Sequence, residues 1–471
     1  MRASVSELDL LHEATLRLLS RTGVRVGSAE VLDLLASVGV RVDRRAQRAY
    51  PGEEQVHRAL ASAPRSFALY GRATAAPLIV GGENAWIVAG GGSVRVLTLD
   101  CRYEPSTWEH LRQFNTLLDA LPNIHVLINQ VDPQGDARAG FYKRLAAEML
   151  IGTPKPPLFQ AGDAEDVHAF VEMGVAIRGS RQALRDKPIF MTGGNAEPPL
   201  YIPAHVAELH VAASREGIPS SVGDYVMMGV TGPETVAGAV VEINAIQLTA
   251  LIMSQAAQPG APFSYTCFGG SANMRTLDPL TANPQSLKLI RLAAELGHWY
   301  GLPTYSAAPV DAKMADSQAA CERAVQLEIL LDAGVNLIQG PTSHMDQMML
   351  SSFVQAVIDD EIAGYVLAAH RRPEITEETL ALDVIGDVVA EPTLQALKFA
   401  AHPHTVRHLR ADLWEPRVFI EDGFLAWQAI GAPTVYERAE SIAREILASH
   451  CPEPLPAATE AQIREIAGAI P

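Results

Sequence analysis

The middle of the chain alternates short apolar segments with longer segments of helical periodicity. The apolar segments recur roughly every 30 to 45 residues, a spacing that is typical of β-α units with parallel strands. This pattern predicts strands at His125–Asn129, Pro157–Ala161, Ile189–Thr192, Ser220–Met227, Phe263–Phe268, Thr304–Ala308 and Asn336–Gln339, with an eighth near Val384–Val389.

Turn-forming and polar residues follow several of the predicted strands, as in Gly193-Gly194-Asn195, Gly269-Gly270-Ser271 and Gly340-Pro341-Thr342. A (β/α)8 barrel builds its active site from the loops at the carboxyl ends of its strands. The sequence therefore favours an α/β fold of the (β/α)8 (TIM) barrel type. A doubly wound open sheet is the structural alternative.

Both ends of the chain are predicted to be helical. Ser4 and Glu7 form the pattern of a capping box, and Ser28 is placed to cap a second helix. Residues 79–99 contain glycine-punctuated β-like pieces, which we interpret as hairpins that lead into the barrel. The expected organisation is an N-terminal helical region at 1–75, a barrel at 76–421 and a C-terminal helical tail at 422–471.

Composition and charge narrow the class of protein. The 471 residues are 48% hydrophobic and 19% charged, which excludes a mainly disordered chain, and the net charge of −17 argues against nucleic acid as a partner. The uncharged stretch from Ile243 to Met274 is broken by two prolines, so we expect a buried helix and a buried strand rather than a membrane span. Four scattered cysteines and the lack of a signal-peptide pattern indicate the cytoplasm.

Familiar motifs for cofactors and nucleophiles do not occur in the sequence. The dinucleotide fingerprint, the phosphate loop, His-Glu-x-x-His and Gly-x-Ser-x-Gly are all missing. The densest group of histidines is His402, His404 and His408, which we interpret as surface side chains at a helix start, since a zinc site would need a further ligand. No resident metal or cofactor is therefore expected.

Three segments have an unusual composition: residues 229–245, 259–276 and 311–322. The first joins a Gly/Pro turn to a helix that contains Glu242. In the third, Asp311, Lys313, Asp316 and Gln318 follow a predicted strand and open a helix. Helix capping and a buried Lys–Asp pair would also explain the third segment.

Together these segments resemble the trimethylamine methyltransferase superfamily. Further matches are Leu11-His-Glu-Ala, Gly23-Val-Arg-Val and His402-Pro-His-Thr, so that the resemblance covers about residues 8 to 450. It implies a (β/α)8 barrel that passes a methyl group from an N-methylated amine to the cobalt of a separate corrinoid protein. Founding members use pyrrolysine, whereas this chain contains only the 20 ordinary residue types.

The chain is thus similar to the non-pyrrolysine branch, whose characterised members demethylate quaternary amines such as glycine betaine. One departure concerns the helix after the Gly-Pro turn. The family often has Asn-Ala-Glu there, whereas this chain has Asn244-Ala245-Ile246, and its acid is Glu242, one turn earlier. The corrinoid would be presented by the partner protein and not bound permanently.

A quaternary ammonium needs positioning more than acid–base catalysis, because its leaving group is already a neutral amine. Aromatic faces bind such cations, and the candidates near the predicted loops at the barrel mouth are Trp86, Tyr103, Tyr225, Tyr265 and Phe268. We expect Glu242, Lys313 and His344 to converge at the barrel mouth as catalytic residues. Glu242 would balance the ammonium charge, while Lys313 and His344 would face the anionic end of the substrate. Substrate-binding roles are further assigned to Arg275, Asp311, Asp316 and Gln318.

The sequence also allows three other hypotheses about the function. A non-catalytic barrel could bind a quaternary amine as a sensor or storage protein, and a trimethylamine-specific methyltransferase would share the fold. A lyase would use Asp311, Lys313 and Asp316 for proton abstraction and would need no corrinoid. The sequence leaves a homo-oligomer open and does not name the amine.

Overall fold

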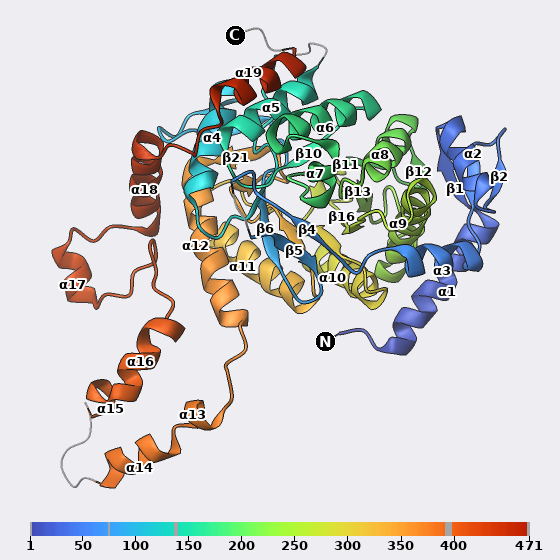
Figure 1. The fold of residues 1–471 in the computed structure, drawn as a ribbon. Helices are drawn as coiled ribbons and strands as arrows, with labels where there is room; N and C mark the ends of the chain where they lie inside the picture. Colours follow the sequence, from blue (N-terminus) through green and yellow to red (C-terminus); the bar gives the residue numbers. More distant parts are fainter. Residues whose placement is uncertain (1, 74–75, 136–139, 391–397, 469–471) are drawn as a thin grey trace.

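Eight parallel strands close into a barrel at the centre of the computed structural model, which describes residues 2–73, 76–135, 140–390 and 398–468 (Figure 1). A five-stranded sheet in the order β15-β18-β19-β6-β9 continues into a three-stranded sheet, β10-β11-β13. Parallel bridges from Leu127 to Pro157 and from Ser220 to Phe263 join the two sheets and complete the ring. The strands are β6 (Trp86–Ala89), β9 (Val126–Leu127), β10 (Leu158–Gln160), β11 (Met191–Asn195), β13 (Ser220–Gly223), β15 (Tyr265–Cys267), β18 (Thr304–Ala307) and β19 (Leu337–Gln339).

The barrel and seven of its strands are confirmed, but the predicted eighth strand at Val384–Val389 is wrong. That segment lies in helix α14 (Leu382–Ala390). The missing strand is β6, which opens the barrel and pairs with the last strand, β19. Its four residues are followed by three glycines, and this composition is equally typical of the hairpin that we expected there.

Helices follow the barrel strands and cover the outside of the ring (Figure 1). They are α4 (Trp108–Ala120), α5 (Phe141–Gly152), α6 (Ala164–Arg178), α7 (Arg181–Asp186), α8 (Ala204–Glu216), α9 (Val236–Ala257), α10 (Pro284–Trp299), α11 (Ser317–Asp332) and α12 (Phe353–His370). Among the described residues, α9 alone has the length and hydropathy of a membrane span. It is mostly buried between α1, α3, α8 and α10, so it is a core helix, as the sequence predicts.

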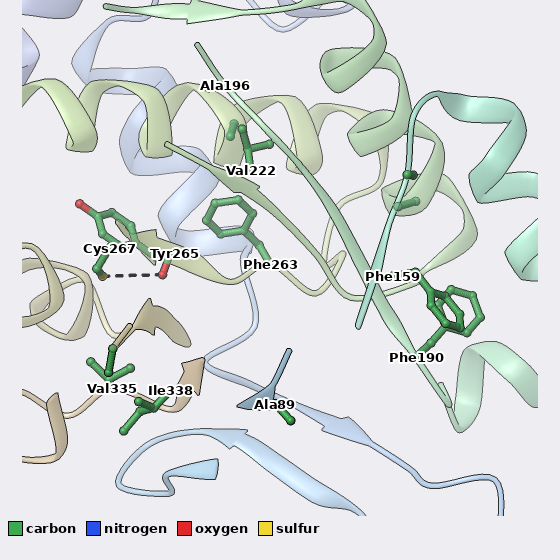
Figure 2. Packing of buried hydrophobic residues seen from close by; sticks show 14 of the residues in the cluster. Ala89, Phe159, Phe190, Ala196, Val222, Phe263, Tyr265, Cys267, Val335 and Ile338 are labelled. Carbon is green, nitrogen blue, oxygen red and sulfur yellow. Dashed lines mark hydrogen bonds between the residues drawn. The ribbon is translucent and has the colours of Figure 1, made fainter. Parts of the chain in front are cut away.

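The strands send alternate side chains to two separate apolar layers. Phe159 and Phe190 belong to the outer layer, which packs under the helices (Figure 2). The inner layer contains Val88, Val126, Leu158, Met191, Tyr305 and Leu337, and Phe67, Leu69 and Val80 pack against it. The last three residues come from the hairpin of β4 (Ser66–Leu69) and β5 (Leu78–Gly81). This hairpin plugs the amino-terminal end of the barrel with apolar side chains, whereas polar loops surround the other end.

The N-terminal region combines the predicted helices with a small sheet that we did not expect. The helices are α1 (Val5–Arg21), α2 (Ala29–Ser37) and α3 (Glu53–Ser62). The capping box is confirmed, since the backbone N–H of Ser4 donates to the Glu7 carboxylate at 2.8 Å. The sheet joins β1 (Val24–Val26), β2 (Arg41–Asp43) and β3 (Arg48–Tyr50) to β12 (Tyr201–Ile202).

Short strands also order the loops at the carboxyl end of the barrel. One group is β7 (Arg95–Leu97), β8 (Tyr103–Pro105), β20 (His344–Met345) and β21 (Leu350–Ser352); the other is β14 (Val226–Met227), β16 (Gly269–Ala272) and β17 (Pro279–Leu280). Backbone hydrogen bonds therefore hold these loops in place and make them a firm support for a site.

After α12 the chain leaves the barrel as an arm and then returns to the same flank (Figure 1). The arm, residues 371–434, contains α13 (Glu377–Leu380), α14, α15 (Lys398–Ala401), α16 (Pro403–Asp412) and α17 (Phe424–Ala429). Helix α18 (Val435–Ser449) then packs against α12, and α19 (Ala457–Ile466) packs on α5 and α6.

Candidate functional site

A cavity of about 440 Å³ lies at the carboxyl end of the barrel. All eight barrel strands or the residues directly after them contribute to its wall. In the order of the strands, these residues are Gly91, Ile128, Gln160, Asn195, Ser221, Phe268, Ala307 and Gln339. The volume suits a small molecule, and the position is the one where barrels of this type place their chemistry.

Aromatic and neutral polar side chains line this cavity. Tyr142, Tyr225, Tyr305 and Phe268 supply the aromatic part, and the rings of Phe268 and Tyr305 meet edge to face at 4.9 Å. The Tyr305 hydroxyl donates to the Gln339 side chain. Burial raises the pKa of Tyr225 and of Tyr305, so these phenols stay neutral. No Asp, Glu, Lys or Arg is among the described residues that form the wall.

The backbone after β6 approaches the cavity so closely that only glycine fits. At Gly91, with φ +153°, a Cβ atom would lie 2.4 Å from Met348 Cε and 2.6 Å from His344 Cε1. It would also lie 2.9 Å from Gln339 Nε2. Met348 and Gln339 are part of the wall, so Gly91 lets three loops converge at the mouth.

His344 therefore lies next to the wall residues Met348 and Gln339, but its charge differs from the expectation. Its side chain is fully buried on the loop after β19, where Arg323 Nη2 donates to the His344 carbonyl at 2.9 Å. Burial and the neighbouring Arg323 lower the pKa of His344 to about 3. The imidazole is neutral near pH 7 and does not present a cation to an anionic substrate group.

Glu242 lies outside the barrel wall, on α9, and not beside His344. Gly223 and Tyr225 face the cavity, whereas the carboxylate of Asp224, between them, is fully buried near Glu242. Neither Asp224 oxygen has a hydrogen-bond partner among the described residues. Burial raises the pKa of Glu242 to about 7, and burial together with Glu242 raises the pKa of Asp224 well above its usual value. Burial therefore favours the neutral, protonated form of both acids behind the wall.

The cluster after β18 is held by structural contacts. The Asp311 carboxylate accepts from the hydroxyl and backbone of Thr281, at 2.7 and 3.0 Å. Asp316 caps α11, and the Gln318 side chain donates to Glu322 at 2.7 Å. Lys313 is exposed, and its ammonium pairs with a carboxylate that we did not anticipate, that of Asp346, at 3.2 Å. None of these four residues is part of the cavity wall, so nothing here favours the lyase.

Four other predicted residues also lie away from the cavity. Trp86 begins β6 and therefore lies at the plugged end of the barrel, where its indole N–H donates to the Ile79 carbonyl at 2.9 Å. Tyr265 is fully buried on the outer face (Figure 2). Its hydroxyl donates to Asn244 at 3.1 Å. Tyr103 and Arg275 are exposed on loops. Of the five predicted aromatic residues, the structure brings Tyr225 and Phe268 to the cavity.

The residues that the sequence analysis missed are Tyr142, Gln160, Asn195, Tyr305 and Gln339. Gln160 and Gln339 are the last residues of barrel strands, and Asn195 ends a third. A polar residue at the carboxyl end of a predicted strand was a visible signal for each of them. Tyr142 begins a helix and carried no such signal.

Potential metal ligands do not gather among the described residues, which contain no group of three or more His, Cys, Asp or Glu side chains placed to hold an ion. The rings of His404 and His408 lie 4.4 Å apart on α16, and His408 faces Glu378 at 3.8 Å.

These features define a (β/α)8-barrel enzyme with an aromatic cavity at the carboxyl end of its strands, whose described wall lacks Asp, Glu, Lys and Arg. The sequence matches the trimethylamine methyltransferase (MTTB) family over residues 3–467, so the chain belongs to that family and is a methyltransferase. The resemblance noted from the sequence is thereby confirmed.

Relatives and solved structures agree with this assignment. The chain is 28% identical over 465 residues to the trimethylamine methyltransferase MttB of Desulfitobacterium hafniense, covering 98% of this chain and 92% of the relative. It is 24% identical over 460 residues to a glycine betaine methyltransferase of the same species, covering 97% and 94%. The structure of the Methanosarcina barkeri monomethylamine methyltransferase MtmB superposes with a TM-score of 0.51 at 10% identity, covering 94% of this chain and 86% of MtmB, which supports the fold.

Proposed function

We propose that this methyltransferase takes a methyl group from a quaternary amine of the betaine class and passes it to the Co(I) of a corrinoid held by a separate protein. The observation that supports the substrate class is the cavity wall, which combines three tyrosines and a phenylalanine and presents no Asp, Glu, Lys or Arg among its described residues. Aromatic faces attract a quaternary ammonium by about 0.5 to 2 kcal/mol each.

The lack of a carboxylate in the described wall also favours a quaternary amine over trimethylamine. Trimethylamine has to keep a proton on its nitrogen during transfer, because only then does dimethylamine leave as a neutral molecule. The described wall contains no carboxylate that would stabilise this N–H group. A quaternary amine carries no such proton, and its tertiary amine leaves with the electron pair of the C–N bond.

The chain's own contribution is positioning and desolvation. Tyr225, Phe268 and Tyr305 would hold the ammonium group and direct one methyl toward the open end of the barrel. Corrinoid Co(I) supplies the electron pair that forms the new bond to that methyl carbon. Gln160 and Asn195 are the neutral polar groups available for the other end of the substrate.

The rim around the cavity supports the proposal that a second protein carries the corrinoid that accepts the methyl group. Met274, Met314 and Met349 lie on loops after β15, β18 and β19 and expose between 50% and 65% of their surface. Flexible methionine side chains suit a surface that binds and releases a partner in each turnover. Such chemistry suits the cytoplasm, as do four cysteines that form no disulfide.

A methyl-transfer assay with free cob(I)alamin tests this proposal. Glycine betaine, proline betaine, carnitine, choline and trimethylamine are each offered, and formation of methylcob(III)alamin is followed by absorbance. We expect at least one quaternary amine to be demethylated while trimethylamine is inert. Turnover of trimethylamine alone would overturn the choice of substrate, and binding of a quaternary amine without any transfer would favour the storage or sensor protein.

A further inference from the structure

Two helices of the arm expose apolar side chains along one face each, and a third helix adds further exposed apolar residues. On α14, Leu382, Ile385 and Val389 recur at i, i+3 and i+7. Val406, Leu409 and Leu413 repeat this spacing on and directly after α16. Helical residues with this spacing form a stripe, and a stripe of this kind is what a helix normally buries against a neighbour.

The third group lies on and directly after α17, where Phe424, Leu425 and Ile430 are exposed. We call these nine side chains the arm face. Their exposed fractions range from 47% to 79%, although each is a large hydrophobic residue. The outermost part of the chain in Figure 1 is thus also one of its most apolar surfaces.

Contacts with α12 hold the base of the arm in a fixed position on the barrel. The Glu361 carboxylate on α12 accepts hydrogen bonds from the backbone N–H groups of Arg417, Val418 and Phe419, at 2.9 to 3.1 Å. Trp414 packs edge to face on Tyr365 at 5.4 Å beside them. Both ends of the arm are therefore tied to one flank, and its apolar stripes stay exposed in the isolated chain.

We propose that the arm face is the interface through which a second copy of this chain binds, in a two-fold exchange of arms. The nine side chains expose on the order of 100 Å² each, so that two copies would bury roughly 1,800 Å², the area of a stable protein–protein interface. A two-fold axis brings the same surface of both subunits together. The apolar stripes of α14 and α16 in one copy would therefore pack against the same stripes in the other copy.

The other candidate occupant is the methyl-accepting protein, and the character of the arm face argues against it. A methyl carrier has to leave after each transfer, and transient interfaces are about as polar as the rest of a protein surface. The nine side chains of the arm face are all aliphatic or aromatic. They also belong to none of the loops that line the cavity. A permanent partner fits this surface better.

Light scattering after size-exclusion chromatography of the full chain tests the proposal. At micromolar concentration we expect the wild-type protein to have at least twice the chain mass. The double variants Leu382→Glu/Val389→Glu and Val406→Glu/Leu409→Glu should be monomers, because a carboxylate in the interface would be buried without a partner. Leu10→Glu, at an exposed position of α1 away from the arm, is the matched control and should keep the wild-type mass.

Hydrogen exchange on the wild-type protein covers the case in which a variant does not fold. Amides of α14 and α16 should be protected at high protein concentration and lose this protection on dilution, while amides of α9 stay protected. A monomeric wild-type protein, or an oligomer that both arm variants retain, would overturn the proposal. A folded monomeric arm variant is expected to demethylate with free cob(I)alamin as the wild type does, since the arm lies outside the cavity.

Discussion

Arg323 and Asp359 form a bidentate ion pair, at 3.0 and 3.1 Å, in which both side chains are fully buried. The same guanidinium donates to the carbonyls of Ala308 and His344, and the same carboxylate accepts from the backbone N–H of Ser343 at 2.6 Å. One pair thus connects the loops after β18 and β19, which both border the cavity. Arg323 and Asp359 are positioning residues for the barrel mouth.

Removing one partner of this pair should destabilise the whole protein. For Asp359→Ala we expect a loss of about 3 to 5 kcal/mol in the free energy of unfolding, because the guanidinium is left buried and unpaired. Asp33→Ala, which removes the partner of Arg44 in an exposed pair, should cost less than about 1 kcal/mol. Urea unfolding of both variants checks this, and equal losses would contradict the structural role.

The aromatic wall should determine the affinity for a quaternary amine. Tyr225→Leu and Phe268→Leu should each raise KM roughly twofold to thirtyfold, since each removes a cation–π contact. Tyr225→Phe keeps the ring and should stay within about twofold of the wild type. Tyr103→Leu is the control, because Tyr103 is exposed outside the cavity. Steady-state kinetics with free cob(I)alamin measures all four, and a wild-type KM in both leucine variants would contradict this site.

A methyl group at Gly91 should impair transfer more than it impairs folding. Its Cβ would collide with Met348, His344 and Gln339, so Gly91→Ala should displace the wall and lower kcat/KM by at least about tenfold. Gly82→Ala provides a matched comparison, because Gly82 also has a positive φ but has no atom within 4 Å of the added Cβ. We expect both variants to melt a few degrees below the wild type, with activity lost only in Gly91→Ala. Full activity in Gly91→Ala would contradict the close approach.

The buried pair of acids should make stability depend on pH. The pKa of Glu242 rises from 4.5 in the unfolded chain to about 7 in the fold, so the unfolded state binds fewer protons than the native state between these values. The contribution of Glu242 to the free energy of unfolding should therefore be fully present below pH 4.5 and should decrease as the pH rises toward 7. Asp224, whose pKa is also raised, acts in the same direction.

Glu242→Gln should remove most of this dependence. From pH 5 to pH 7.5, the free energy of unfolding of the wild type should fall by on the order of 1 to 2 kcal/mol more than that of the variant. Asp224→Asn should act similarly, because the pKa of Asp224 is also raised in the fold. Urea unfolding at the two pH values measures the effect. The result that would speak against a protonated pair is a variant whose stability changes with pH as the wild type's does.

Local features of the sequence determined several elements of this protein. Ser4 and Glu7 define a helix start within four residues, and the uncharged run from Ile243 indicates a core helix and strand, because capping and burial depend on neighbouring residues. Most barrel strands were also visible, since short apolar segments bounded by turns recur along the chain. The family pattern extended this to the fold and to the class of reaction.

Tertiary structure alone decided how the ring closes and which side chains meet in the cavity. Leu337 pairs with Trp86 across most of the chain, and no local pattern distinguishes such a pairing from a hairpin. Strand alternation then sends Tyr265 outward and Tyr305 inward, although both lie in predicted strands. Lys313 pairs with Asp346, which comes from the next loop around the barrel. The strand pairing, the side-chain directions and the ion pair all depend on how the ring closes. That closure is set by contacts between residues far apart in sequence.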